Sequence, residues 1–227
     1  MRHIAIISIV LLAGCASPAL PPAHDYTLAI LTAGPQADAL SDDTVATASA
    51  GHRAHIESMG ADGTLLLAGP FGEPRASDAW RGLYVFDLSD MAAAHDLAQA
   101  DPAVVAGLFD IVLMPWRSDR DLRPLRDEIE RGKAKGEPFV PAAYVLAMGE
   151  PTGQARAALK TLSEQQRVIC AGGLGGERQG QQLALLTAET VGEAGAWLGV
   201  ADPGVQWQLS SLWATALLGN LASQPSP

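Results

Sequence analysis

His52 is the residue whose spacing points most directly to chemistry. It stands four and seven residues before Ile56 and Met59, so the three share one face of a helix predicted over residues 43–59. The two apolar side chains direct this face toward a sheet, and the imidazole then points inward. An imidazole can accept and return a proton near neutral pH. A core histidine hydrogen-bonded to a carbonyl explains the same pattern, and both interpretations stay open.

Asp101 is followed by Pro102, a pair typical of the start of a helix. The carboxylate accepts a hydrogen bond from a backbone N–H, and the proline occupies the first turn. The pair recurs as Asp202-Pro203 in a part of the chain that has no matching histidine. This recurrence favours a capping role for both aspartates.

Arg75 and Trp80 fall in or beside a predicted loop between two strands, where they could hold an organic anion. Solvated loop residues are the alternative interpretation. His55 lies three residues after His52, a spacing that can present two metal ligands. No nearby cysteine or histidine completes a ligand set, so the sequence predicts no metal site and implies no cofactor.

An internal repeat organises the chain. Residues 64–72 align with residues 167–175, and the order of matching residues continues to the two Asp-Pro pairs. The repeat predicts one unit over residues 25–117 and a second over 139–219. A charged stretch over 118–138 joins them and is predicted to form a short exposed helix, and residues 220–227 are predicted to be a tail.

The elements predicted in the first unit are strands at 26–32, 64–68, 82–87 and 109–116 and helices at 43–59 and 89–99. This β-α-β-β-α-β order is ferredoxin-like. Three of the strands are apolar nearly throughout, so both faces of the sheet must be covered, whereas the helices of one unit can cover only one face. We therefore predict an α+β fold in which two tandem units pack sheet to sheet as a pseudo-dimeric α/β barrel within one chain, and a monomer.

The N-terminus has the pattern of a secretion signal. A positive start precedes an apolar stretch over residues 4–13, which is shorter than the roughly 20 residues that a membrane-spanning helix needs. Leu12-Ala13-Gly14-Cys15 resembles the bacterial lipobox, which implies cleavage after residue 14 and a lipid on Cys15. Residues 15–24 then read as a tether, and Ala16 after the cysteine favours the periplasmic face of the outer membrane.

The amino-acid composition and net charge limit the classes of partner that we expect the protein to bind. A net charge of −10 and a pI near 4.8 oppose sustained contact with nucleic acid. With 48% apolar and 18% charged residues, the chain is predicted to fold around a packed core. Cys170, in an apolar setting, is predicted to be a buried small hydrophobic residue.

Several motifs together resemble the YCII-related domain family. They are His52, residues 63–70 with the pattern Gly-x-Leu-Leu-x-Ala-Gly-Pro, Asp101-Pro102 and Pro115-Trp116. The resemblance implies a dimeric α/β barrel and a catalytic pair of His52 and Asp101. Trp116 is a further candidate for substrate binding. The second unit is more degenerate, because Ala155 replaces the histidine and Gly173 replaces the proline.

The resemblance also implies a reaction class. Relatives in the family include an enzyme that eliminates chloride from an aromatic compound, so we expect proton-transfer chemistry, as an isomerase or lyase, on a small cyclic or aromatic acid. The competing hypothesis is a non-catalytic binding or structural module of the cell envelope. Loss of the histidine in the second unit favours that alternative.

Overall fold

The computed structural model describes residues 23–150, 153–201 and 207–224. The predicted signal peptide, Cys15 and most of the predicted tether lie outside these residues. Unit 1 comprises β1 (His24–Ala33), α1 (Asp42–Asp62), β2 (Leu65–Pro70), β3 (Trp80–Phe86), α2 (Met91–Gln99), α3 (Pro102–Val105) and β4 (Phe109–Ser118). Unit 2 comprises β5 (Pro141–Gly149), α5 (Gly153–Glu164), β6 (Val168–Leu174), η1 (Gly176–Arg178), β7 (Gln182–Leu186), α6 (Val191–Ala201) and β8 (Trp207–Thr215). Helix α4 (Arg123–Ala134) joins the units, and the 3-10 helix η2 (Ala216–Ser223) follows β8.

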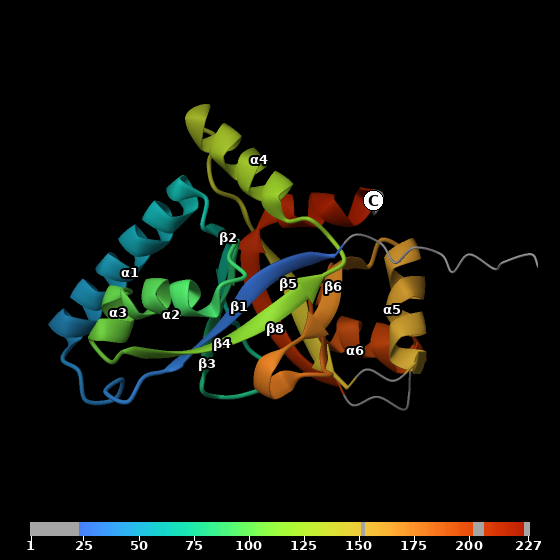
Figure 1. The fold of residues 1–227 in the computed structure, drawn as a ribbon, viewed down its shortest axis with the longest axis horizontal. Helices are drawn as coiled ribbons and strands as arrows, with labels where there is room; N and C mark the ends of the chain where they lie inside the picture. The colour runs from blue at the N-terminus through green and yellow to red at the C-terminus, as the bar shows by residue number, and fades with distance from the viewer. Residues whose placement is uncertain (1–22, 151–152, 202–206, 225–227) are drawn as a thin grey trace, which may run out of the picture.

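The eight strands form one antiparallel sheet in the order β2-β3-β1-β4-β6-β7-β5-β8. Strand β4 pairs with β6 over residues 116–118 and so joins the two units. At the other end, Phe71 just after β2 bridges Leu212 of β8, and the N–H of Gly72 donates to the Ser211 carbonyl at 3.0 Å. The sheet is nearly closed into a barrel (Figure 1), which confirms the predicted α+β architecture.

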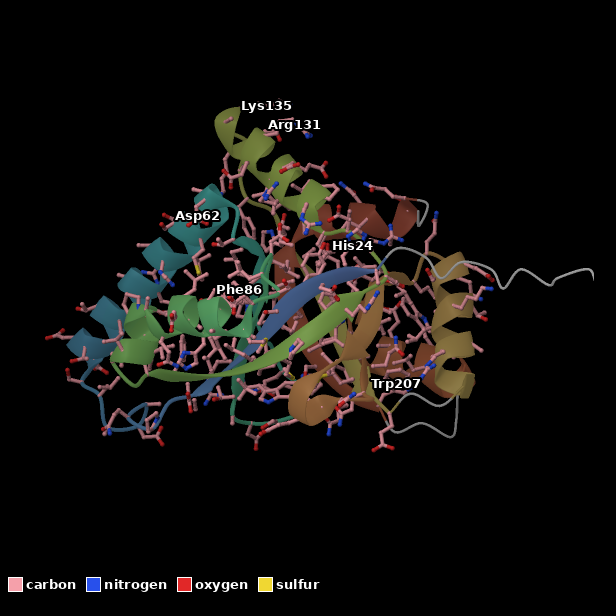
Figure 2. All side chains as sticks on the ribbon, in the orientation of Figure 1. His24, Asp62, Phe86, Arg131, Lys135 and Trp207 are labelled. Carbon is pink, nitrogen blue, oxygen red and sulfur yellow. The ribbon has the colours of Figure 1, made fainter. Side chains whose placement is uncertain are left out.

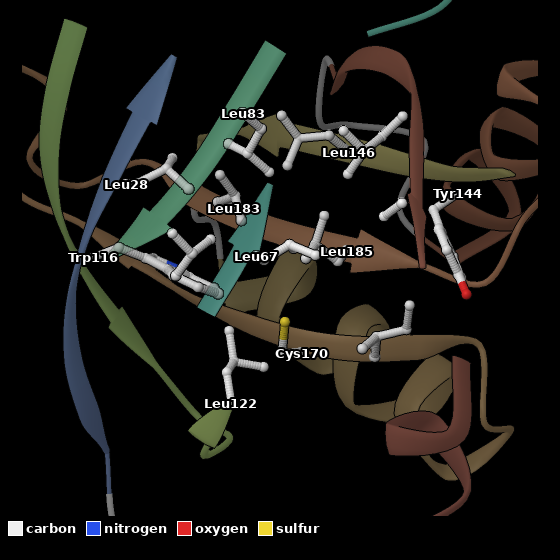
Figure 3. Close-up of a cluster of buried hydrophobic side chains, with 14 of the residues drawn as sticks. Leu28, Leu67, Leu83, Trp116, Leu122, Tyr144, Leu146, Cys170, Leu183 and Leu185 are labelled. Carbon is white, nitrogen blue, oxygen red and sulfur yellow. The ribbon is translucent and has the colours of Figure 1, made fainter. Parts of the chain in front are cut away.

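Both units contribute to one core inside the barrel. Leu28, Leu83 and Trp116 of unit 1 and Leu146 and Leu185 of unit 2 belong to the same cluster of buried side chains (Figure 3), and each is at most 1% exposed. The strands of the two units also pair at β4 and β6, so backbone hydrogen bonds as well as apolar packing hold the units together. This shared interior is why neither unit presents a wet face.

The outer faces of the strands are covered by helices. Along β3, Leu83 and Val85 point into the barrel, while Tyr84 and Phe86 point outward against a separate apolar cluster under the helices of unit 1. Helices α1, α2 and α3 lie on one side of the barrel, and α5 and α6 lie on the other (Figure 1). Within the described part of the chain, no helix combines the length and the apolar character needed to cross a membrane.

Two repeat-equivalent glycines permit close approach at the two seams between the units. A Cβ added to Gly69 would overlap the carbonyl oxygen of Trp213 in β8, and one added to Gly172 would overlap that of Arg117 in β4. Glycine is the residue that leaves room for backbone at such points. The conserved register of the internal repeat therefore reflects the pseudo-two-fold closure of the barrel.

Helix α4 is more than the exposed helix predicted for the charged stretch. Leu122 at its N-cap and Leu125 in its first turn are fully buried in the barrel core. Arg123 near its start pairs with Asp87 at 2.8 Å, whereas Figure 2 shows Arg131 and Lys135 at the end farthest from the barrel. The helix is amphipathic, and its apolar side covers one end of the barrel.

The second unit extends beyond its predicted end at residue 219. Helix η2 continues to Ser223, and Leu221 and Ala222, 2% and 7% exposed, pack against the barrel core. The stretch 220–227 is therefore not a free tail throughout, because its first residues bury apolar side chains. The short apolar pair gave too weak a periodic signal for a helix to be predicted.

Leu125→Ala tests the role of α4. We expect it to lower the free energy of unfolding by about 2–5 kcal/mol, because it leaves a cavity in the shared core. Val105→Ala, at a site that is 75% exposed, is the control and should change the free energy by less than about 0.5 kcal/mol. Urea unfolding measures both, and equal small losses would contradict the assignment of α4 to the core.

Candidate functional site

The site is built where α1 passes close to α3. Ser41 caps α1, with its Oγ accepting from the Thr44 N–H, and the helix then runs along the outer face of the sheet. A Cβ on Gly51 would lie 2.7 Å from the Pro102 side chain, so glycine lets the two helices approach. This approach brings His52, the residue after Gly51, beside the start of α3.

His52 and Asp101 form a close hydrogen-bonded pair. The imidazole Nδ1 lies 2.7 Å from the Asp101 Oδ2. The other carboxylate oxygen, Oδ1, accepts from the N–H of Ala103 at 2.9 Å and caps α3. Asp101 thus caps α3 with one oxygen and contacts His52 with the other.

Tyr84 completes what we call the polar cluster, namely His52, Tyr84 and Asp101. Its hydroxyl donates to Asp101 Oδ2 at 3.2 Å and lies 3.3 Å from His52 Nε2. The tyrosine comes from β3, the histidine from α1 and the aspartate from the start of α3. The cluster therefore links one strand to two helices on the outer side of the barrel.

The electrostatics of the cluster keep Asp101 charged. Burial is the largest effect and raises the pKa of Asp101. Hydrogen bonds from His52 and the Ala103 N–H, the charge of His52 and a hydrogen bond from Tyr84 all lower it. Together these outweigh burial, so the pKa of Asp101 is below its ordinary value. Burial, followed by the negative charge of Asp101, raises the pKa of Tyr84. Tyr84 consequently stays a hydrogen-bond donor over the physiological range.

The arrangement orients His52 as a base. An ionised carboxylate only accepts hydrogen bonds, so Nδ1 carries a proton, and in the neutral ring the lone pair is on Nε2. Phe109 packs edge-on against the ring at 5.2 Å between centroids, and 17% of the histidine side chain is exposed. One turn before His52, a groove of about 340 Å³ between α1 and α3 is lined by Ala48 and Pro102, among others. The lining of this groove does not include His52, Tyr84 or Asp101. A proton acceptor held by a carboxylate can perform general base catalysis.

The other substrate-binding candidates lie elsewhere. Trp80 is the first residue of β3, beside the predicted loop, is 8% exposed and packs against Phe71 inside the barrel with 5.4 Å between the ring centroids. Trp116 is also in the interior, because its position on β4 directs it inward. The wall of the barrel thus separates both tryptophans from the polar cluster, and they do not form one site with His52.

Arg75 lies in the connection between β2 and β3, which packs against β8 of unit 2. Its guanidinium pairs with Glu73 at 2.6 Å, and its Nε is buried without a hydrogen-bond partner in the described structure. The neighbouring Ala76 N–H donates to the Ser210 hydroxyl at 2.9 Å. These contacts assign Arg75 to the contact between the units, away from the polar cluster.

His55 does not join His52 as a metal ligand. Its Nε2 donates to the Leu97 carbonyl at 3.1 Å, which ties α1 to α2. In the part of the chain that the structure describes, no group of three or more histidine, cysteine or acidic side chains could hold a metal ion. Asp202 and Pro203 lie outside the described residues. Cys170 is 1% exposed in the core, as predicted.

Sequence reasoning missed Tyr84 and Phe109 as parts of the site. Both stand in predicted strands, where an aromatic side chain is most simply explained as core. A signal was available for Tyr84, because its hydroxyl is the only polar side-chain group between Leu83 and Phe86 and a buried tyrosine needs a partner.

One comparison with known protein families finds a match in the first unit. Residues 27–117 match the model of the YCII-related domain. Among curated proteins there is no match. The solved structures similar to this chain include a protein from Lactobacillus acidophilus assigned as a monooxygenase, with a TM-score of 0.46, 10% identity and coverage of 84% of this chain and 95% of the other. The siroheme decarboxylase NirDL also has a TM-score of 0.46, with 8% identity and coverage of 84% and 71%. Likeness at this level indicates neither a substrate nor an activity.

Asp101→Asn tests the electrostatics of the cluster. We expect it to lower the free energy of unfolding at neutral pH by about 2 kcal/mol or more, because buried donors lose a charged acceptor. The pKa of Asp101 is lower in the folded state than its unfolded value of about 3.9. The charge of Asp101 therefore contributes fully to the free energy of unfolding above the unfolded pKa. This contribution is lost as the pH falls through the folded pKa. Urea unfolding of both proteins, repeated at successively lower pH, should show the difference shrinking in acid. A difference independent of pH would contradict the assignment.

Proposed function

We propose that the polar cluster is a proton-transfer site acting on a small cyclic or aromatic acid, since residues 27–117 match the model of the YCII-related domain. The observation that carries the proposal is the 2.7 Å contact between His52 Nδ1 and Asp101 Oδ2. It fixes one tautomer and leaves Nε2 as the basic nitrogen. Alanine in either position would remove that arrangement.

The proposed step begins with a C–H bond beside the carboxyl or carbonyl group of the substrate. His52 Nε2 takes the proton, and the electron pair of the C–H bond forms a new C=C bond. In a lyase the electron pair displaces a leaving group from the neighbouring carbon, and in an isomerase the proton returns at a different carbon. Asp101 stabilises the imidazolium that forms, through its contact with Nδ1.

The apolar surroundings of His52 suit such a substrate. Phe109 covers one edge of the imidazole, and the nearby groove combines Ala48 and Pro102 with the polar side chains of Asp43 and Thr44. A small ring can lie against apolar carbon while its polar groups stay in water. The step requires no cofactor, since proton transfer uses only the histidine and its partners.

The location proposed for the protein is the periplasmic face of the outer membrane, with a lipid on Cys15 as its anchor. The sequence pattern Leu12-Ala13-Gly14-Cys15 supports it. The described structure begins at Ala23, and β1 begins at His24, so eight residues separate the anchor from the barrel. Such a spacer allows the folded part to stand off a lipid surface.

The alternative is a structural or non-catalytic binding role for the same residues. It is favoured by one observation: Asp101 is fully buried and both caps α3 and links α1 to β3. A polar cluster of that kind can serve only to fix the helices on the sheet. In that case ligands would have no effect that depends on His52.

Ligand-dependent thermal unfolding separates the two roles. Purified protein is heated alone and with a panel of small lactones, phenols and aromatic acids, for wild type, His52→Ala and His55→Ala. We expect a ligand to stabilise wild type and His55→Ala, by about 2.7 kcal/mol at 100 times its Kd, and not His52→Ala. Each variant is compared with its own unliganded midpoint, so lost stability alone cannot imitate the result. Equal shifts in all three proteins would exclude a site at His52, and the absence of any shift would favour the structural role.

Cys15→Ser tests the anchor. We expect wild type to fractionate with membranes and to carry a lipid detectable by mass spectrometry, whereas the variant is released, because a serine hydroxyl cannot form the thioether. Ser17→Ala, two residues away, is the control and should remain with the membrane. Membrane association of Cys15→Ser equal to that of wild type would contradict lipid anchoring.

A further inference from the structure

A cleft of about 920 Å³ opens in unit 2 between α5, the beginning of β6 and η2. Its apolar lining comes from Leu159 of α5, Val168 and Ala171 of β6 and Ala222 of η2. The volume lies within the range of small-molecule binding sites, about 300–1,000 Å³. It is separate from the polar cluster, which belongs to unit 1.

The equivalent place in unit 1 is covered. In the repeat register, Gly60 and Gly63 at the end of α1 correspond to Ser163 and Gln166 of unit 2. Helix α4 reaches the two glycines, since Arg126 Nη1 donates to the Gly63 carbonyl at 3.5 Å and a Cβ on Gly60 would lie 3.9 Å from the Lys133 Nζ. Ser163 and Gln166 instead line the cleft. The opening is therefore a specific difference between two units that share one topology.

One wall of the cleft is held rigidly. Arg120, 6% exposed, donates from Nη1 to the carbonyls of Leu221 at 2.6 Å and Gln224 at 3.1 Å, which fixes η2 against the barrel. Beside it, Asp119 Oδ1 accepts from the Ala171 N–H at 2.8 Å. The cleft is thus bounded by side chains that are already ordered, so a ligand need not organise this wall on binding.

The opposite rim carries positive charge. Arg156 and Lys160 are exposed, stand four residues apart on α5 and line the cleft, with Glu164 one turn further. Together with Arg120 and Asp119, the lining has three cations and two carboxylates, whereas the whole chain has a net charge of −10. Burial raises the pKa of Asp119, although the Ala171 N–H and Arg120 oppose the shift. The lining of the cleft is therefore cationic, although the protein as a whole is acidic.

We propose that this cleft binds an amphipathic organic anion, a carboxylate with an apolar chain. The chain would cover the apolar lining, where removal of carbon surface from water provides the driving force. The carboxylate would lie between Arg156 and Lys160, which can both donate to it. Neither the apolar lining alone nor the two cations alone would select such a ligand, and the cleft places them together.

Isothermal titration calorimetry with laurate, below its micellar concentration, tests the proposal on the full chain. We expect laurate to bind wild type and to bind the double variant Arg156→Ala/Lys160→Ala at least about tenfold more weakly, because two charged donors are lost. Dodecanol, which has the same chain without the charge, should bind both proteins with the same affinity. Arg131→Ala/Lys133→Ala, at the end of α4, is the matched control and should bind laurate like wild type.

A second pair of variants tests whether laurate binds in this cleft. Ser163→Trp should fill the cleft and weaken laurate and dodecanol alike, whereas Thr161→Trp, at an exposed position of the same helix, should weaken neither. His52→Ala should leave laurate binding unchanged, so the result is independent of the function proposed for unit 1. Absence of laurate binding to wild type, or an affinity that the charge variants and Ser163→Trp all leave unchanged, would overturn the proposal.

Discussion

Burial of both faces of the sheet is the constraint on which the rest of the molecule depends. Leu83 and Val85 need cover inside the barrel, and Tyr84 and Phe86 need cover outside it, so a unit with helices on one face is incomplete by itself. The second unit supplies the missing side, and the edges join where glycines allow the backbones to approach. Closure within one chain avoids the entropy cost of bringing two subunits together.

This construction also explains where chemistry can occur. The barrel interior is filled by large side chains from both units, so polar groups that act on a ligand must stand outside it. In unit 1, the Tyr84 side chain points outward from β3 and reaches Asp101. The contact of Gly51 with Pro102 brings His52 close to Asp101. In unit 2, the different placement of the helices leaves a cleft instead. One topology therefore presents two unlike surfaces.

The order of elements and the barrel could be predicted because apolar strands and their spacing are local signals that recur along the chain. His52 could be placed inward from its helical spacing alone. The inward position of Trp116 and the outward position of Tyr84 could not, because they depend on strand register, which the turns and bulges of the folded sheet determine. Capping and pairing by Asp101 looked like alternatives because sequence patterns do not distinguish two oxygens of one carboxylate.

The measurement that most directly tests the account is the protonation pattern of the His52 ring, observed by ¹⁵N–¹H NMR of selectively labelled protein at a pH where the imidazole is neutral. The hydrogen bond to Asp101 predicts a proton on Nδ1 and an unprotonated Nε2, with the pattern altered in Asp101→Asn. A proton on Nε2 in wild type, unchanged by the substitution, would contradict the account, because Asp101 would then not orient the histidine and Nε2 could not act as a base.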